Sequence, residues 1–100
     1  GNGSIMRLAP VPLAFFNDPV NAVEKSAESS RTTHGATVAV DACRYMAAII
    51  VGALKGEIKE TLLSANHGPD PSYWDQLPHC PEIAAIAAGY ENMIRIGLAI

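Results

Sequence analysis

The sequence predicts an all-α fold, and three observations carry this prediction. Apolar residues recur at helical spacing in several separate stretches, two segments are typical of helix starts, and no run alternates convincingly as a strand. The two start signals are Asn17-Asp18-Pro19 and Pro81-Glu82. With 100 residues, 49% of them hydrophobic, the chain has room for one domain around a modest core.

The first third of the chain predicts a short helical segment followed by a longer helix. Residues 4–9 are expected to form one or two helical turns, which Pro10 and Pro12 interrupt. Asp18 suits the N-cap and Pro19 the first position of a helix over residues 19–29. The side chains expected in the core around the proline bend are Val11, Leu13, Phe15 and Phe16.

The longest predicted helix covers residues 37–54 and is apolar on nearly every side. Asp41 and Arg44 are its only charged residues, and their i, i+3 spacing places them on one narrow stripe. A helix of this composition is buried on most sides. Few short helices are available to enclose it, so we expect the chain to be a piece of a larger protein.

The second half predicts a short amphipathic helix, a long loop and a final helix. The short helix is expected over residues 57–65, with Ile58, Leu62 and Leu63 inward. The Pro- and Gly-rich residues 66–80 are expected to form a loop that Tyr73, Trp74 and Leu77 anchor. The last helix begins near Pro81, and its apolar side chains at helical spacing are Ile83, Ile86, Ala87, Tyr90, Met93 and Ile94.

Charge and composition exclude several classes of partner. The net charge is −3 and the sequence has no Lys/Arg cluster, which argues against a nucleic-acid partner. The longest uninterrupted apolar run, residues 46–54, is too short to span a bilayer, so no membrane is expected. No secretory signal is present, which favours a cytoplasmic setting with Cys43 and Cys80 as reduced thiols.

The candidate ligand site lies in the first residues, Gly1-Asn2-Gly3-Ser4-Ile5-Met6-Arg7. A glycine-rich turn that leads into a helix can seat an anion, because the free N–H groups of the helix point into the turn. The alternative is a plain turn in which Ser4 only caps the helix.

The histidines supply one further ligand candidate and one group to consider as a metal site. His34 could bond a sugar hydroxyl or stack on a ligand ring; the alternative is a loop residue without a partner. His67, His79 and Cys80 fit no zinc spacing, so no metal site is predicted there.

Two segments resemble the ADP-ribosylglycohydrolase family. Residues 1–11, Gly-Asn-Gly-Ser-Ile-Met-Arg-Leu-Ala-Pro-Val, closely resemble one signature of that family. A second segment agrees at about the expected distance, with Ser-Arg-Thr-Thr-His at residues 30–34 and Ala-Val-Asp-Ala-Cys-Arg at residues 39–44. The resemblance covers most of the chain.

The resemblance implies an all-α, metal-dependent hydrolase that removes ADP-ribose from modified protein side chains or cleaves related compounds. By similarity, Gly1, Asn2, Gly3 and Ser4 would line the diphosphate and ribose of ADP-ribose. Met6 would pack beneath the ligand and His34 would sit near the ribose, while Arg7 would be structural.

The family's metal-binding segments are not found in these 100 residues. In the intact family enzyme two Mg²⁺ ions are held by a Thr-Asp-Asp segment before the glycine turn and by an Asp-x-Asp-Thr segment near the C-terminus, and neither occurs here. We therefore expect residues 1–100 to form a partial, orthogonal helical bundle without catalytic or metal-binding residues, inactive on its own. The alternative is a helical binding module that self-associates as a homo-oligomer to cover exposed apolar faces.

Overall fold

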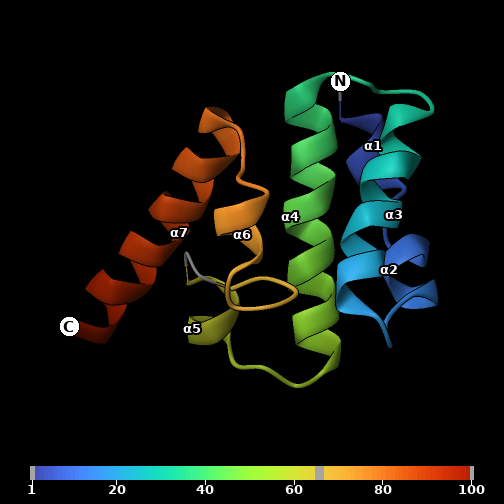
Figure 1. The fold of residues 1–100 in the computed structure, drawn as a ribbon. Helices are drawn as coiled ribbons and strands as arrows, with labels where there is room; N and C mark the ends of the chain where they lie inside the picture. The colour runs from blue at the N-terminus through green and yellow to red at the C-terminus, as the bar shows by residue number, and fades with distance from the viewer. Residues whose placement is uncertain (1, 65–66, 100) are drawn as a thin grey trace.

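The computed structural model describes residues 2–64 and 67–99, and α4 (Thr37–Leu54) lies at its centre (Figure 1). Within these residues every regular element is a helix, which confirms the all-α prediction. The other elements are α1 (Gly3–Met6), α2 (Pro10–Ala14), α3 (Pro19–Arg31), α5 (Lys59–Leu62), α6 (Tyr73–Gln76) and α7 (Pro81–Ala99).

The helix termini follow from local sequence signals. The Asp18 carboxylate accepts a hydrogen bond from the Asn21 amide at 3.2 Å, and Pro19 opens α3, as predicted. This helix runs to residue 31, two residues beyond the predicted end. The bounds of α4 match the prediction, and the chain leaves it through Gly56, whose φ of 85° lies in the left-handed region.

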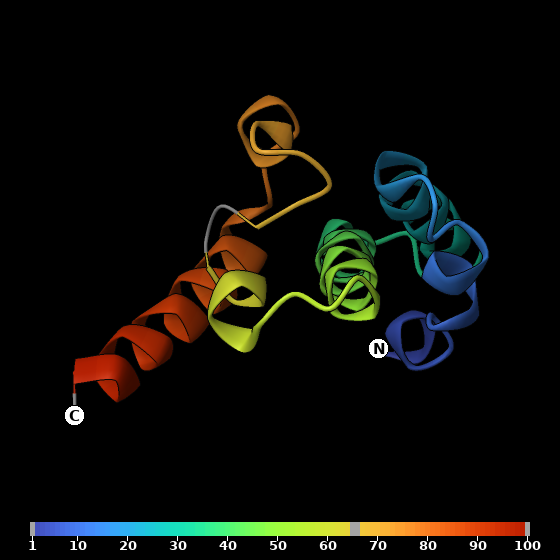
Figure 2. The same ribbon diagram turned by 90° about the horizontal axis from the view of Figure 1, so that it is seen from below.

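The core lies between α4 and the N-terminal helices. Viewed along α4, helices α1 to α3 lie on one side of it, and α5 to α7 lie on the other (Figure 2). The buried cluster consists of Leu8, Val23, Cys43, Ala47, Ala48 and Tyr73. Half of this cluster belongs to α4, and most of the partly buried residues packed against it, Ile5, Val11 and Val20, come from the N-terminal side.

Several predicted core residues are on the surface instead. Leu13 is 54% exposed because the α2 turn directs Pro12 inward in its place. Ile58 and Leu77 are also exposed, so neither anchors its segment. Val11 does pack against the core, and Phe15 and Phe16 are half-buried.

The second half is less regular than predicted. The helix expected over residues 57–65 is reduced to α5, and residue 65 lies outside the described residues. The expected loop contains the short helix α6, whose Tyr73 is buried. On α7, Ile83 and Ala87 are buried, whereas Ile86, Tyr90 and Met93 are exposed; the Ile94 side chain lies outside the described residues.

Helix α4 is long and apolar enough to cross a membrane, the one such helix in the described part of the chain. Length and composition alone do not distinguish such a span from the central helix of a folded domain. Here α4 packs against α1, α2, α3, α5 and α7, and it carries the buried carboxylate of Asp41. We interpret it as the core helix, and the absence of a membrane partner stays a prediction.

Candidate functional site

The structure brings the two signature segments together at Gly3 and His34. A Cβ atom added to Gly3 would lie 3.0 Å from His34 Cε1 and 3.2 Å from Nε2. The missing side chain at Gly3 therefore makes room for the imidazole ring against the backbone of α1. Two predicted ligand residues, 31 positions apart in sequence, thus share one small surface.

The backbone around this surface starts a helix. The Met6 amide donates to the Asn2 carbonyl at 3.1 Å, which is the first hydrogen bond of α1. The amides of Gly3, Ser4 and Ile5 precede that bond, so the helix itself supplies them no partner. Asn2 occupies the N-cap position, and its exposed side chain makes no capping bond. Gly1 lies outside the described residues.

The side chain of Ser4 points into the protein, so Ser4 is not the N-cap that the alternative interpretation predicted. The helix begins at Gly3, two residues earlier than an N-cap at Ser4 requires. The Ser4 hydroxyl is buried 2.9 Å from Ser30 Oγ and 3.6 Å from Cys43 Sγ. Its side chain therefore neither caps α1 nor faces a ligand, although its amide remains at the start of the helix.

His34 is half-buried and held by its neighbours. Its Nδ1 shares a 2.8 Å hydrogen bond with the Thr33 hydroxyl, and its amide donates to the Ser30 carbonyl at 2.6 Å. These bonds leave Nε2 as the ring nitrogen beside Gly3. The ring can therefore offer one hydrogen-bonding atom to a ligand at this surface.

Met6 and Arg7 differ in what they contact. Met6 is 76% exposed, so its side chain is available but is not packed in a formed pocket. The Arg7 guanidinium donates to the Ser29 carbonyl at 2.8 Å and to Thr32 Oγ1 at 3.3 Å. Arg7 ties the end of α1 to the C-terminus of α3, which is the structural role predicted for it.

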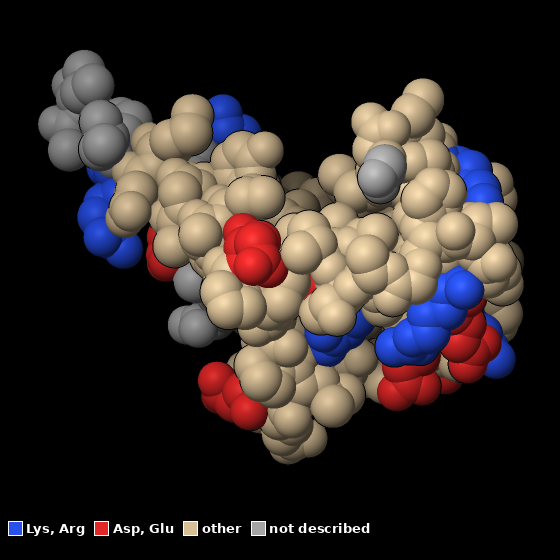
Figure 3. Space-filling model, turned by 90° about the horizontal axis from the view of Figure 1, so that it is seen from above, with Lys and Arg blue, Asp and Glu red and all other residues tan. Residues whose placement is uncertain are grey.

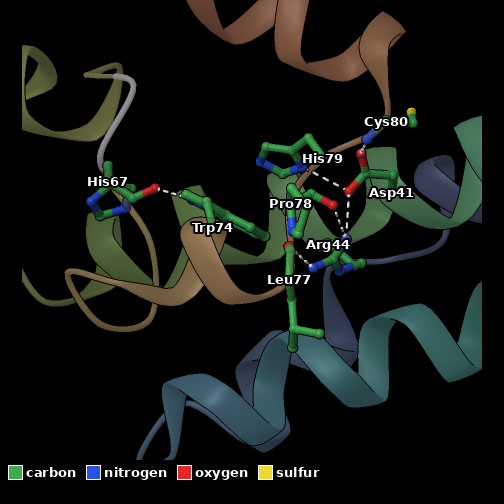
Figure 4. A network of polar contacts seen from close by, with 8 residues as sticks. All are labelled: Asp41, Arg44, His67, Trp74, Leu77, Pro78, His79 and Cys80. Atoms are coloured by element: carbon green, nitrogen blue, oxygen red, sulfur yellow. Dashed lines mark hydrogen bonds and ion pairs between the residues drawn. The ribbon is translucent and has the colours of Figure 1, made fainter.

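A second polar cluster surrounds Asp41 on the other side of α4 (Figure 4). Asp41 is 3% exposed, and its Oδ1 lies 2.9 Å from Arg44 Nη1 and 2.7 Å from His79 Nδ1. Its Oδ2 accepts from the Cys80 amide at 2.7 Å. Arg44 also donates to the Leu77 carbonyl at 2.6 Å, so the pair fastens the segment before α7 to α4.

The stripe formed by Asp41 and Arg44 was predicted, but its partners in the 77–80 segment were missed. A carboxylate in an otherwise apolar helix needs partners, which was the available signal. Burial opposes ionisation of Asp41, but the hydrogen bonds from His79 and the Cys80 amide outweigh it and lower its pKa. Burial, with help from Asp41 and Glu82, raises the pKa of the Cys80 thiol, so it stays protonated and is a poor nucleophile.

A cavity of about 660 Å³ lies between α3, the start of α4 and the segment before α7. Charges of both signs line it, from Glu24, Glu28, Arg31, Asp41 and Arg44. Of the described residues, neither Gly3 nor His34 lines this cavity, so it is separate from the surface they share. Figure 3 likewise shows basic and acidic side chains side by side on one face, without an extended basic patch.

The metal ligands of the family have no counterpart among residues 2–64 and 67–99. No three His, Cys, Asp or Glu side chains come together there as a metal site requires. His67 instead contacts Glu57 and the Ala48 carbonyl, while His79 and Cys80 contact Asp41. The described side chains therefore do not form the metal site that the family resemblance implies.

Comparison with known proteins identifies the family of the chain. The family model for ADP-ribosylglycohydrolase matches residues 1–95. No curated protein and no solved structure matches the chain. Because the match extends over nearly the whole sequence and includes both segments that meet at Gly3 and His34, the chain belongs to the ADP-ribosylglycohydrolase family.

Proposed function

We propose that this chain forms one wall of the ADP-ribose site of an ADP-ribosylglycohydrolase-like hydrolase, with Asn2, Gly3 and His34 as its ligand contacts. The observation that carries the proposal is the packing of the His34 ring on the Cα of Gly3. That contact joins the two family segments at a surface with a hydrogen-bonding ring nitrogen and the first backbone amides of α1.

The chemistry of this surface suits the ribose and diphosphate of ADP-ribose. The Nε2 atom of His34 can bond a ribose hydroxyl, since Nδ1 is already engaged by Thr33. The first amides of α1, those of Gly3 and Ser4, offer donors to a phosphate oxygen. Asn2 adds an exposed amide side chain next to them.

Gly3→Ala is the variant that tests this proposal. Alanine favours the helix, but its Cβ would lie 3.0 Å from the His34 ring and force the ring to move by a few tenths of an ångström, so we expect ADP-ribose to bind about tenfold more weakly. Isothermal titration calorimetry measures the affinity. The matched control is Gly89→Ala in α7, where an added Cβ meets no atom within 4 Å. Equal affinities of the Gly3→Ala variant and the wild type would contradict the proposal.

We also propose that the chain by itself binds ADP-ribose without hydrolysing its glycosidic bond. The described residues supply no group of metal ligands, and the thiol of Cys80 is held protonated. Release of ADP-ribose from a modified protein by this polypeptide, in the presence of Mg²⁺, would contradict this part of the proposal.

A self-associating helical module is the second candidate, and the exposed stripe on α7 favours it. Ile86, Tyr90 and Met93 are all exposed and follow one another at i, i+4 and i+7. If this stripe pairs two chains, light scattering will give about twice the 10.5 kDa mass, and Met93→Glu will return it to that of one chain. A wild-type monomer at high concentration would exclude this function.

A further inference from the structure

The side chain of Ser30 lies at the junction between the two signature segments. It is completely buried, near the end of α3. Its hydroxyl oxygen is 2.9 Å from Ser4 Oγ and 2.9 Å from the His34 carbonyl oxygen. Ser4 Oγ is in turn 3.6 Å from Cys43 Sγ on α4. These contacts form a chain of four polar groups across three helices and His34, which lies between α3 and α4.

The direction of hydrogen bonding along this chain follows from its acceptors. A hydroxyl carries one hydrogen, and the His34 carbonyl can only accept, so Ser30 donates to it. Ser4 must then donate to Ser30 Oγ, and Ser4 Oγ is left to accept from the Cys43 thiol. In this order every hydroxyl and thiol hydrogen has an acceptor, which a buried polar network requires.

Ser30 binds the backbone amide of His34 as well as its carbonyl group. The His34 amide donates to the Ser30 carbonyl at 2.6 Å, while the His34 carbonyl accepts from the Ser30 hydroxyl. Both polar groups of the His34 backbone are thus bound to one residue. That same residue accepts from Ser4, which directly follows Gly3, so the position of the ring is tied to the turn on which it packs.

We infer that Ser30 is a positioning residue, which fixes the His34 ring over Gly3 for a ligand. The inference rests on the proposed function of His34 in ADP-ribose binding. Removing the Ser30 hydroxyl leaves the His34 carbonyl and the Ser4 hydroxyl without their partner, so the ring is expected to leave Gly3. The consequence is weaker binding of ADP-ribose, by about fivefold.

Ser30→Ala and Ser26→Ala form a matched pair that tests this inference. Ser26 is equally buried on α3, but its hydroxyl donates only to the Ala22 carbonyl, at 2.7 Å, within the same helix. Ser26→Ala loses one buried hydrogen bond within α3, whereas Ser30→Ala loses two, one of which is the link to His34. The readout is nuclear magnetic resonance of the whole chain, in which the imidazole ring shifts the Gly3 Hα resonance by its ring current.

We expect the ring-current shift of the Gly3 Hα resonance, called here the Gly3 shift, to disappear in Ser30→Ala and to persist in Ser26→Ala. Ser30→Cys keeps a weak donor, so part of the Gly3 shift should remain in that variant. Retention of the shift in Ser30→Ala, or equal loss in both alanine variants, would overturn the inference. Should Ser30→Ala not fold, Ser30→Cys decides the question: a Gly3 shift smaller than that of the wild type supports the link, and an unchanged shift overturns it.

Titration with ADP-ribose separates this inference from the proposed function. Suppose that the wild type does not bind ADP-ribose, but the Gly3 shift is lost in Ser30→Ala and kept in Ser26→Ala. The positioning of His34 by Ser30 is then supported, and only the proposed function is contradicted. If the wild type binds with the same affinity as Ser30→Ala, the positioning role is overturned even though the proposed site stands.

Discussion

Replacing Asp41 with alanine is expected to lower the free energy of unfolding by about 3–5 kcal/mol, because it leaves buried partners without a counter-charge. Asp41 is 3% exposed and receives hydrogen bonds from Arg44, His79 and the Cys80 amide. The side chain of His79 is 8% exposed, so water cannot readily replace the lost carboxylate. Chemical denaturation followed by circular dichroism measures the change.

The control for this variant is Glu24→Ala, which removes an exposed carboxylate from α3 and is expected to change stability by about 0.5 kcal/mol or less. The pH dependence supplies a second check. The pKa of Asp41 is lowered in the folded state, so its contribution is complete above its ordinary pKa and is lost as the pH falls through the folded value. Wild-type stability should therefore fall below about pH 4, and the Asp41→Ala variant should show a smaller fall. Identical acid profiles would contradict this account of Asp41.

Leu8→Ala is expected to cost about 2–5 kcal/mol, because it opens a cavity in the best-packed part of the molecule. Leu8 is 1% exposed and belongs to the buried cluster that joins the N-terminal segment to α3 and α4. Its loss should also loosen α1, which carries Gly3 and Ser4 and ends two residues before Leu8. Denaturation in urea measures the stability of the variant.

Leu13→Ala is the matched control for that variant. The two changes remove the same atoms, but Leu13 is 54% exposed on α2, so its loss should cost less than about 1 kcal/mol. If Leu13→Ala destabilised the chain as much as Leu8→Ala, the packing described for α1 and α2 would be wrong.

The contrast between these leucines shows that the sequence alone could not assign the buried residues of a short helix. Apolar character placed Leu13 in the core, yet the short turn of α2 buries Pro12 and turns Leu13 outward. The bounds of α4 were predicted correctly, because this largely apolar 18-residue segment ends at the clear stop signal of Lys55-Gly56. Short helices lack such signals, and tertiary packing decides their ends.

The sequence predicted residues of the candidate site but not the contacts between them. The resemblance named Gly3 and His34, and the structure adds their direct contact. Ser4 was expected at the surface, but a helix start at Gly3 turns its hydroxyl toward Ser30. Two partners of Asp41, His79 and Cys80, lie 38 and 39 residues further along the chain, so no local spacing could identify them.

The most direct test of the proposed site is a titration of the isotope-labelled chain with ADP-ribose, followed by the backbone amide resonances. The proposal predicts that the amides of Gly3, Ser4 and His34 shift together and saturate with a single affinity. It also predicts that the amides of Arg44 and Cys80, beside the separate cavity, stay in place. Shifts concentrated at Arg44 and Cys80, or none at saturating ligand, would contradict an ADP-ribose site built on Gly3 and His34.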